Sequence, residues 1–188
     1  MGNTVGVLSY QGSVIEHMKS LSKIDGITPV EVKTIEGINS IDRLIIPGGE
    51  STTISKLLKI FGLFEPLKKR IQDGMPVWGT CAGMILLANN IVGEDAHLQC
   101  MDITVKRNAY GSQLDSFSCD QVISEFSEKP LPLVFIRAPY IESVGDNVKV
   151  LCNLNGHIVS AKQDNVLVTS FHPELTEDIT IHKYFCNM

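Results

Sequence analysis

The sequence predicts an α/β protein with three layers, in which helices cover both faces of a mostly parallel central sheet. Two observations predict this class. Through the first half of the chain, apolar strand-like runs alternate with segments of helical spacing, which is the order of a parallel sheet with crossover helices. The second half contains strand runs separated by turn signals, so we expect antiparallel additions to the sheet there.

The first half supplies the predicted parallel strands and the helices between them. The strand runs occupy residues 4–9, 28–33, 43–49 and 76–80. Apolar residues recur with helical spacing in segments 13–24, 51–62, 64–74 and 82–91. Ser51 or Thr52 is expected to cap the second of these helices, because a hydroxyl oxygen accepts from the free N–H groups at a helix start.

The second half supplies strands joined by tight turns. Strand runs cover residues 98–108, 131–141 and 147–172, and the last run is interrupted at Asn155-Gly156 and Asp164-Asn165. Such pairs are typical of hairpin turns. A short helix is expected in residues 176–188. Because neither a linker nor an internal repeat is found, we predict that residues 1–188 form one domain.

Composition narrows the class of function. The net charge of −5 lacks the basic footprint of a nucleic-acid-binding protein, and no apolar stretch is long enough to cross a bilayer. The five cysteines and five histidines are widely spaced and show no zinc-type pairing. We therefore expect a cytoplasmic protein with free thiols, without a metal or other cofactor, that binds neither nucleic acid nor membranes.

Cys81 is the first candidate for chemistry. It stands in GTCAG (residues 79–83), where a strand must turn sharply into a helix between small neighbours, as a nucleophile does at an elbow. Free N–H groups at the helix start favour a thiolate, and the N–H of Ala82 is suitably placed to bind an oxyanion. From this motif alone, a buried structural cysteine remains an equal alternative.

Two further loops carry candidate residues. His172 follows a strand and precedes Pro173, and an extended backbone would direct His172 and Glu174 to the same side, as an imidazole and its orienting carboxylate require. The loop PGGEST (residues 47–52) contains two glycines that allow close approach to a ligand. Taken singly, an incidental loop histidine and an ordinary turn with a helix cap explain these motifs equally well.

Together these motifs resemble a known family. PGGEST, GTCAGM and FHPE, in this order, are similar to the class I (triad) glutamine amidotransferases, which have a flavodoxin-like fold. The additional stretches QGSVIEH, RNAYGSQLDSF, VFIRAP and SFHPELTED narrow the resemblance to the glutaminase subunits of glutamine-dependent pyridoxal 5′-phosphate synthases. The resemblance runs from about residue 4 to residue 188.

The resemblance implies a role for each matching residue. Cys81 would be the nucleophile, His172 the general base and then acid, and Glu174 its orienting partner, so that glutamine is hydrolysed to glutamate and ammonia through a thioester. The backbone of Gly49 and Ala82 would form the oxyanion hole, and Gln11 would couple partner docking to its formation. Residues implied to bind L-glutamine are Gly48, Gly49, Glu50, Arg107, Ile136 and Arg137. Packing alone would place Ile136 in the core and Arg107 on a strand surface.

The same resemblance implies a partner and no bound cofactor. One glutaminase-sized domain uses the whole chain, so the enzyme that accepts ammonia must be a separate chain. By resemblance this chain is a (β/α)₈-barrel synthase in a large hetero-oligomer, and pyridoxal phosphate is its product. The sequence departs from the family pattern at Ser112 and, in the first loop, at Tyr10 and Ser13. We expect neither departure to touch the triad.

Three alternatives stay open on the sequence alone. The chain could be the glutaminase of another pathway, such as anthranilate, imidazole glycerol phosphate or GMP synthesis. It could be a noncatalytic interaction module that retains the fold. It could also be a cysteine hydrolase of related α/β type that acts on peptides or glyoxals.

Overall fold

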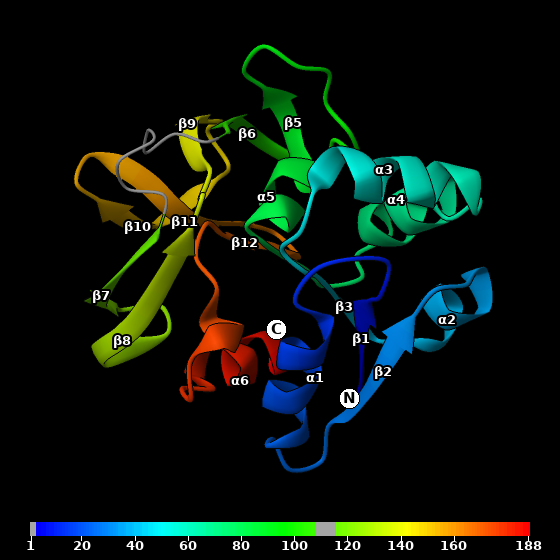
Figure 1. Cartoon of the computed structure of the whole chain (residues 1–188), viewed down its shortest axis with the longest axis horizontal. Helices are drawn as coiled ribbons and strands as arrows, with labels where there is room; N and C mark the ends of the chain where they lie inside the picture. Colours follow the sequence, from blue (N-terminus) through cyan, green and yellow to red (C-terminus); the bar gives the residue numbers. More distant parts are fainter. Residues whose placement is uncertain (1–2, 108–115) are drawn as a thin grey trace.

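A largely parallel sheet forms the centre of the molecule in the computed structural model, which describes residues 3–107 and 116–188 (Figure 1). Five neighbouring strands of this sheet run parallel, in the spatial order β2-β1-β3-β4-β12. Their bounds are β1 (Thr4–Leu8), β2 (Thr28–Val32), β3 (Arg43–Ile46), β4 (Val77–Thr80) and β12 (Val166–Thr169).

The second half of the chain extends this sheet beyond β12, mostly with antiparallel strands. The order continues β12-β11-β9-β6-β5, with β10 paired to β11. Strand β11 pairs antiparallel with β12, β9 and β10, and β9 also pairs antiparallel with β6, whereas β5 and β6 pair in parallel. The bounds are β5 (Ala88–Ile91), β6 (Met101–Lys106), β9 (Tyr140–Val144), β10 (Lys149–Leu154) and β11 (His157–Gln163); a separate hairpin pairs β7 (Ser116–Ile123) with β8 (Ser127–Ile136).

Helices cover both faces of the sheet and give the protein its three layers. The core on one face contains residues of α2 (Ile35–Ser40), α3 (Ser51–Ile60), α4 (Phe64–Gln72) and α5 (Ala82–Leu87). The core on the other face contains residues of α1 (Val14–Ser22), α6 (Thr180–Cys186) and the β7–β8 hairpin. The predicted three-layer α/β class is confirmed.

The buried strands have apolar side chains on both faces because each face is covered by a core. In β3, Leu44 and Ile46 point into the first core, whereas Ile45 points into the second. In β4, Val77 and Trp78 divide in the same way. This alternation explains why these strands read as continuous apolar runs in the sequence.

Two element predictions are wrong in their details. The helix expected over residues 82–91 ends at Leu87, and Ala88–Ile91 forms β5, which pairs with β6. This apolar run is compatible with either state, and pairing with a distant strand decides it. The short helix α2 was not predicted. The expected strand run over residues 131–141 is divided into β8 and β9 by a turn at Arg137, whose φ is 43°.

The predicted cap of α3 is also wrong. The N-cap residue is Glu50, whose carboxylate accepts from the backbone N–H groups of Thr52 (3.1 Å) and Thr53 (2.7 Å). Burial raises the pKa of Glu50, but the hydrogen bonds from Thr53 and Thr52 outweigh it and hold the pKa down at about 2. Ser51 lies buried inside the helix instead. A longer side chain one residue earlier reaches the same N–H groups.

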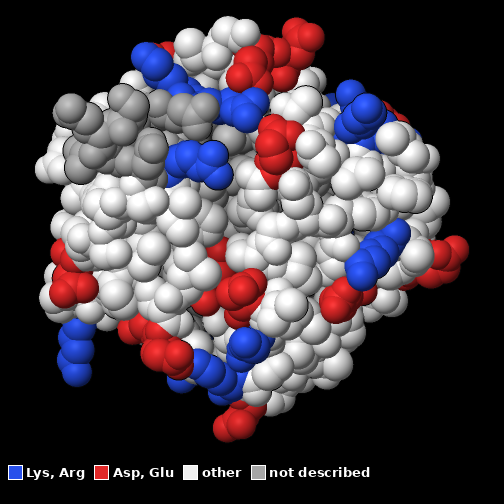
Figure 2. All heavy atoms as spheres, in the orientation of Figure 1, with Lys and Arg blue, Asp and Glu red and all other residues white. Residues whose placement is uncertain are grey.

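The remaining sequence expectations can be placed on this frame. Hairpin turns with positive φ occur at Asn155 and Gly156 and at Asp164, as predicted, and α6 is the expected C-terminal helix. All five cysteines are free thiols. No helix in the described part of the chain has the length and apolar character needed to span a membrane. On the face drawn in Figure 2, acidic and basic side chains are interspersed in small groups.

Candidate active site

Cys81 lies at a sharp turn between β4 and α5. Its backbone adopts φ 49° and ψ −102°, a conformation that is strained for a residue with a side chain and characteristic of nucleophile elbows. The turn is held by a 2.8 Å hydrogen bond from the N–H of Cys81 to the carbonyl of Thr169. A Cβ atom on Gly83 would lie 2.1 Å from the carbonyl oxygen of Ile46. A glycine is therefore needed at position 83, because α5 packs directly on β3 there.

His172 and Glu174 follow the end of β12. The N–H of His172 donates to the carbonyl of Val134 in β8 at 2.8 Å, which directs the chain away from the sheet. The expected extended backbone is wrong here, because Pro173–Leu175 forms one turn of 3₁₀ helix. The turn nevertheless brings Oε1 of Glu174 to 2.7 Å from Nδ1 of His172. The predicted histidine–carboxylate pair is formed.

Cys81 and His172 lie beside each other at the wall of one cavity. The Sγ atom of Cys81 lies 4.0 Å from the carbonyl oxygen of Ile136. Gly48 lies against the pair, since a Cβ atom on Gly48 would stand 2.4 Å from Cε1 of His172 and 3.4 Å from Cβ of Cys81. Loops that follow β3, β4 and β12 thus meet at the carboxyl ends of neighbouring parallel strands, where α/β sheets place their sites.

The electrostatics of the pair favour a protonated imidazole. Burial lowers the pKa of His172, but hydrogen bonds with Cys81 and Glu174 together with their charges raise it to about 10. Burial likewise raises the pKa of Glu174, yet His17, His172 and Ser13 outweigh burial and lower it to about 2. At neutral pH the site therefore holds an imidazolium between an ionised carboxylate and the sulfur.

A cavity of about 540 Å³ opens beside the sulfur, within the range of small-molecule sites. Every sequence-predicted site residue lines it except Glu174, which is 5% exposed and lies behind His172. Ile136 is 36% exposed, so the alternative that places it in the core is wrong. The predicted residues on the cavity wall are Gln11, Gly48, Gly49, Glu50, Cys81, Ala82, Arg107, Ile136, Arg137 and His172.

Arg107 is held over the cavity by two carboxylates. Its guanidinium lies 3.2 Å from Oε1 of Glu50 and 2.7 Å from Oε2 of Glu94. Only 25% of the side chain is exposed, so Arg107 is not simply a charge on a strand surface. Glu50 consequently has two tasks, because the same carboxylate caps α3. Glu94 was not among the predicted residues.

Gln11 joins the first loop to the PGGEST loop. Its Oε1 accepts from the backbone N–H of Glu50 at 3.0 Å. A second link is the 3.3 Å hydrogen bond from the N–H of Ser13 to the carbonyl of Gly48. A displacement of the first loop would therefore be transmitted to the backbone that faces the sulfur.

The expectation that the departures from the family pattern leave the triad untouched is wrong for Ser13. Its hydroxyl donates to Oε1 of Glu174 at 2.5 Å, and it also lines the cavity. The sequence could not show this because 161 residues separate the two positions. Tyr10 stacks on Phe61, with ring centroids 5.4 Å apart. Ser112 lies outside the described residues.

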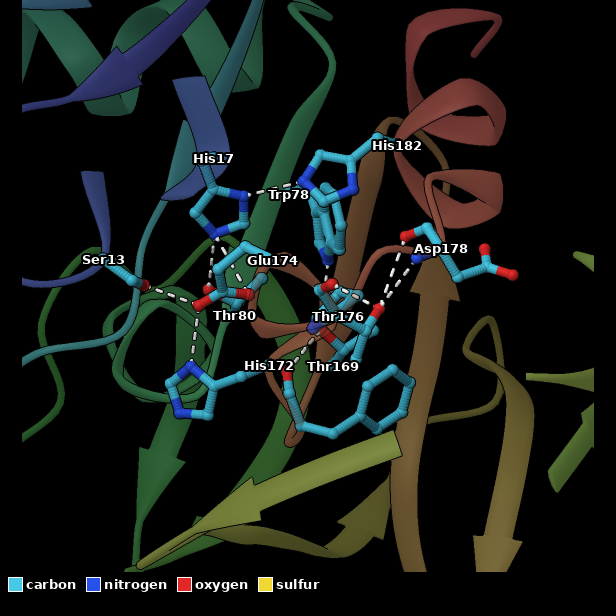
Figure 3. A network of polar contacts seen from close by, with 12 residues as sticks. Ser13, His17, Trp78, Thr80, Thr169, His172, Glu174, Thr176, Asp178 and His182 are labelled. Carbon is cyan, nitrogen blue, oxygen red and sulfur yellow. Dashed lines mark hydrogen bonds and ion pairs between the residues drawn. The ribbon is translucent and has the colours of Figure 1, made fainter. Parts of the chain in front are cut away.

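Three polar residues behind Glu174 were also not predicted as part of the site. His17 of α1 lies between Glu174 and His182 of α6, and its Nε2 also contacts Thr80, the residue before the thiol (Figure 3). His17 is part of the QGSVIEH stretch, which was the only signal that the sequence offered for it. Among the described residues, no group of three or more His, Cys, Asp or Glu side chains could hold a metal ion.

Comparison with known proteins finds similar sequences over nearly the whole chain. The chain is 58% identical over 182 residues to the pyridoxal 5′-phosphate synthase subunit PdxT of Clostridium botulinum, covering 96% of this chain and 94% of the relative. It is 54% identical to PdxT of Caldanaerobacter subterraneus subsp. tengcongensis over 185 residues, with 98% of each chain covered.

Solved structures agree with this relationship. A crystal structure described as a glutamine amidotransferase superposes with a TM-score of 0.91 at 42% identity, covering 97% of each chain. PurLQS from Thermotoga maritima superposes with a TM-score of 0.70 at 17% identity, covering 100% of this chain and 99% of the other; at that identity the likeness concerns the fold alone. The model of one family matches residues 7–188. The chain therefore belongs to the SNO glutamine amidotransferase family.

Proposed function

We propose that the protein hydrolyses L-glutamine to L-glutamate and ammonia, and delivers the ammonia to a pyridoxal 5′-phosphate synthase subunit. The observation that carries the proposal is that Cys81 and His172, the latter paired with Glu174, lie together at the wall of one cavity. Relatives at 54–58% identity are named as PdxT subunits of pyridoxal 5′-phosphate synthase. The whole chain, residues 1–188, would act as one glutaminase domain.

We assign each step of the proposed reaction to a side chain of the site. The sulfur of Cys81, whose proton has passed to His172, attacks the carbonyl carbon of the side-chain amide. His172 then protonates the departing nitrogen, so that ammonia and a glutamyl thioester form. A water molecule, deprotonated by His172, hydrolyses the thioester to glutamate. Glu174 keeps the imidazole oriented and stabilises its charged form throughout.

The oxyanion of each tetrahedral intermediate needs hydrogen-bond donors at the turn. We assign this role to the backbone N–H groups of Ala82 and Gly49, since both residues line the cavity beside the sulfur. The bond from the N–H of Glu50 to Gln11 fixes the loop that contains Gly49. Docking of a partner near Gln11 could then set the orientation of that loop, which is the coupling role we propose for Gln11.

The remaining cavity residues suit a zwitterionic amino acid. Arg107 and Arg137 offer cations for the α-carboxylate, and the carboxylate of Glu50 offers an acceptor for the α-ammonium. Gly48, Gly49 and Ile136 would contact the aliphatic part of glutamine. Leu175 and Ile136 are 43% and 36% exposed at the cavity. Such apolar side chains at the mouth are suited to being covered by a synthase subunit.

The test is ammonia release from L-glutamine, with and without the cognate synthase subunit. Cys81→Ala is expected to abolish release, because the thioester cannot form, while it still co-elutes with the synthase. Cys100→Ala serves as the matched control, since Cys100 is also a free thiol but does not line the cavity.

Three results would contradict the proposal. Release by Cys81→Ala at the wild-type rate would overturn the assignment of the nucleophile. Wild-type protein that is fully active alone and does not bind the synthase would point to the glutaminase of another pathway. A noncatalytic module predicts no release from the wild type under either condition.

A further inference from the structure

The carboxylate of Glu174 is buried and its two oxygens have different surroundings. Oε1 accepts from the hydroxyl of Ser13 and contacts Nδ1 of His172. Oε2 forms no full hydrogen bond within the described residues, and Nε2 of His17 lies 3.4 Å from it. The side chains of His17 and Glu174 are both 0% exposed. His17 is thus the polar group that faces the second oxygen.

The contacts of His17 determine which ring nitrogen has the proton. Nε2 lies 3.3 Å from the hydroxyl oxygen of Thr80 as well as 3.4 Å from Oε2 of Glu174. An ionised carboxylate only accepts, so a lone pair on Nε2 would face the negative oxygen in a dry site. A proton on Nε2 removes this repulsion and can be shared between the two oxygens.

His182 completes the assignment. Its Nε2 lies 3.0 Å from Nδ1 of His17, so a proton on Nε2 of His182 is donated to the lone pair of Nδ1. The Nδ1 atom of His182 has no partner within the described residues, as expected for a nitrogen without a proton. Trp78 packs against both imidazoles, with ring centroids 5.6 and 5.0 Å away. In this row of hydrogen bonds, from His182 through His17, each donor therefore points toward Glu174.

We propose that His17 is a positioning residue, which holds Oε2 of Glu174 by donating from Nε2 while His182 fixes the tautomer of His17. The same nitrogen contacts Thr80, which precedes the nucleophile. His17 thereby ties the carboxylate to the strand that presents Cys81, so that the two halves of the triad are positioned by one side chain. The role in catalysis rests on the proposed glutaminase function; the hydrogen-bonding role does not.

The electrostatic surroundings support two neutral imidazoles behind the triad. Burial lowers the pKa of His17 in spite of the opposing charge of Glu174, and the charge of His172 lowers it further. Burial also lowers the pKa of His182, to about 3. Outside this group, Glu16 acts on His17 and Lys23 acts on His182 at longer range. A neutral imidazole at His17 can donate a hydrogen bond to Glu174 without forming a second ion pair with the carboxylate that stabilises the charged His172.

Two amide substitutions separate positioning from packing. In His17→Gln the amide nitrogen can occupy the place of Nε2 and donate to Glu174, whereas the shorter amide of His17→Asn reaches only toward the place of Nδ1. We expect His17→Asn to lower kcat about 10- to 100-fold, as loss of an outer hydrogen-bonding partner commonly does, with KM for glutamine unchanged. His17→Gln should stay close to the wild type. Rates are measured with the synthase subunit present and referred to folded protein.

A second measurement does not depend on turnover. The titration of the His172 ring is followed by nuclear magnetic resonance in the full chain and assigned with His172→Gln. Without a donor at Oε2, the carboxylate of Glu174 is no longer held against Nδ1 of His172 and therefore stabilises the imidazolium less. The midpoint of His172 should then fall by about one pH unit or more in His17→Asn, but not in His17→Gln.

The outcomes distinguish this proposal from the function it rests on. Equal behaviour of the two variants, in kcat or in the His172 midpoint, would overturn the positioning role of His17. A wild type that releases no ammonia while the midpoints differ as expected would overturn the glutaminase function and leave the hydrogen bond standing. His182→Gln, which can still donate to Nδ1 of His17, should match the wild type in the His172 midpoint; a lowered midpoint would overturn the role of His182.

Discussion

Single residues at the ends of strands create the reactive site. Cys81 accepts a positive φ, which costs on the order of 1–3 kcal/mol for a residue outside its usual backbone regions. The surrounding turn tolerates this because Gly83 lets α5 approach β3 and Gly48 lets the neighbouring loop approach His172. The glycines beside the thiol are therefore requirements of close packing, and they leave the sulfur facing the cavity.

The charge on His172 has a measurable effect on stability. Folding raises its pKa from 6.5 to about 10, so its contribution is fully present below about pH 6.5 and lost as the pH rises through about 10. We expect the difference in unfolding free energy between wild type and His172→Gln to shrink over this range. Urea unfolding at a series of pH values, followed by the fluorescence of Trp78, measures it.

His97 provides the control for this prediction. Burial lowers the pKa of His97 below 6.5, so its imidazole is neutral in both folded and unfolded states at higher pH. The difference between wild type and His97→Gln should therefore stay constant between about pH 8 and 10, where neither state binds the proton. A constant difference for His172→Gln as well would mean that the folded site does not hold an imidazolium.

At the scale of elements, helix α3 shares its cap with the cavity. Glu50 accepts from two N–H groups at the start of α3 and also binds the guanidinium of Arg107. The helix start and the position of Arg107 are consequently coupled through one carboxylate. Helix α2 has an independent cap, in which Thr34 accepts from the N–H of Gly37 at 3.1 Å.

Comparing substitutions at the two caps separates the effect on protein stability from the effect on glutamine binding. Glu50→Ala and Thr34→Ala should each destabilise the protein by about 0.5–2 kcal/mol, since each leaves N–H groups without a cap. Only Glu50→Ala should also raise KM for glutamine, because Arg107 loses its anchor and the cavity loses an acceptor. Urea unfolding and steady-state glutaminase assays check the pair. A matching rise of KM in Thr34→Ala would contradict a local role for Glu50.

At the scale of the whole molecule, two cores on opposite faces of one sheet fix the layers. Helix α6, near the C-terminus, closes the second core through Phe185, which is 0% exposed and lies 5.7 Å from the ring of Trp78. The same helix contains His182, which contacts His17 behind the triad. Packing of α6 therefore supports the site from the same face of the sheet as α1.

Removal of a core side chain should show this dependence. Phe185→Ala is expected to destabilise the protein by about 3–5 kcal/mol, because burial is lost and a cavity remains. Phe61→Ala is the matched control: Phe61 is 55% exposed, so its loss should change stability little. Thermal and urea unfolding compare them. Similar destabilisation by both variants would contradict the assignment of Phe185 to the core.

Prediction from sequence succeeded where the signal is local. Strands such as β1, β3 and β4 are apolar on both faces. Turns such as Asn155-Gly156 can be recognised from two residues, because both adopt a positive φ. It failed where a distant partner decides. The segment Ala88–Ile91 becomes a strand by pairing with β6. The wrong cap of α3 is instead a local error, because Glu50 has a longer side chain that reaches the N–H groups expected to pair with a hydroxyl.

The sequence by itself determined the α/β class and the motifs with Cys81, His172 and Glu174, because small residues at strand ends and apolar alternation are local properties of the chain. Only the tertiary structure decided that Ser13 and His17 of one segment meet Glu174 of another. These contacts join residues more than 150 positions apart. They exist because β1 and β12, which are distant in sequence, run parallel in one sheet and bring the loops that follow them to the same edge.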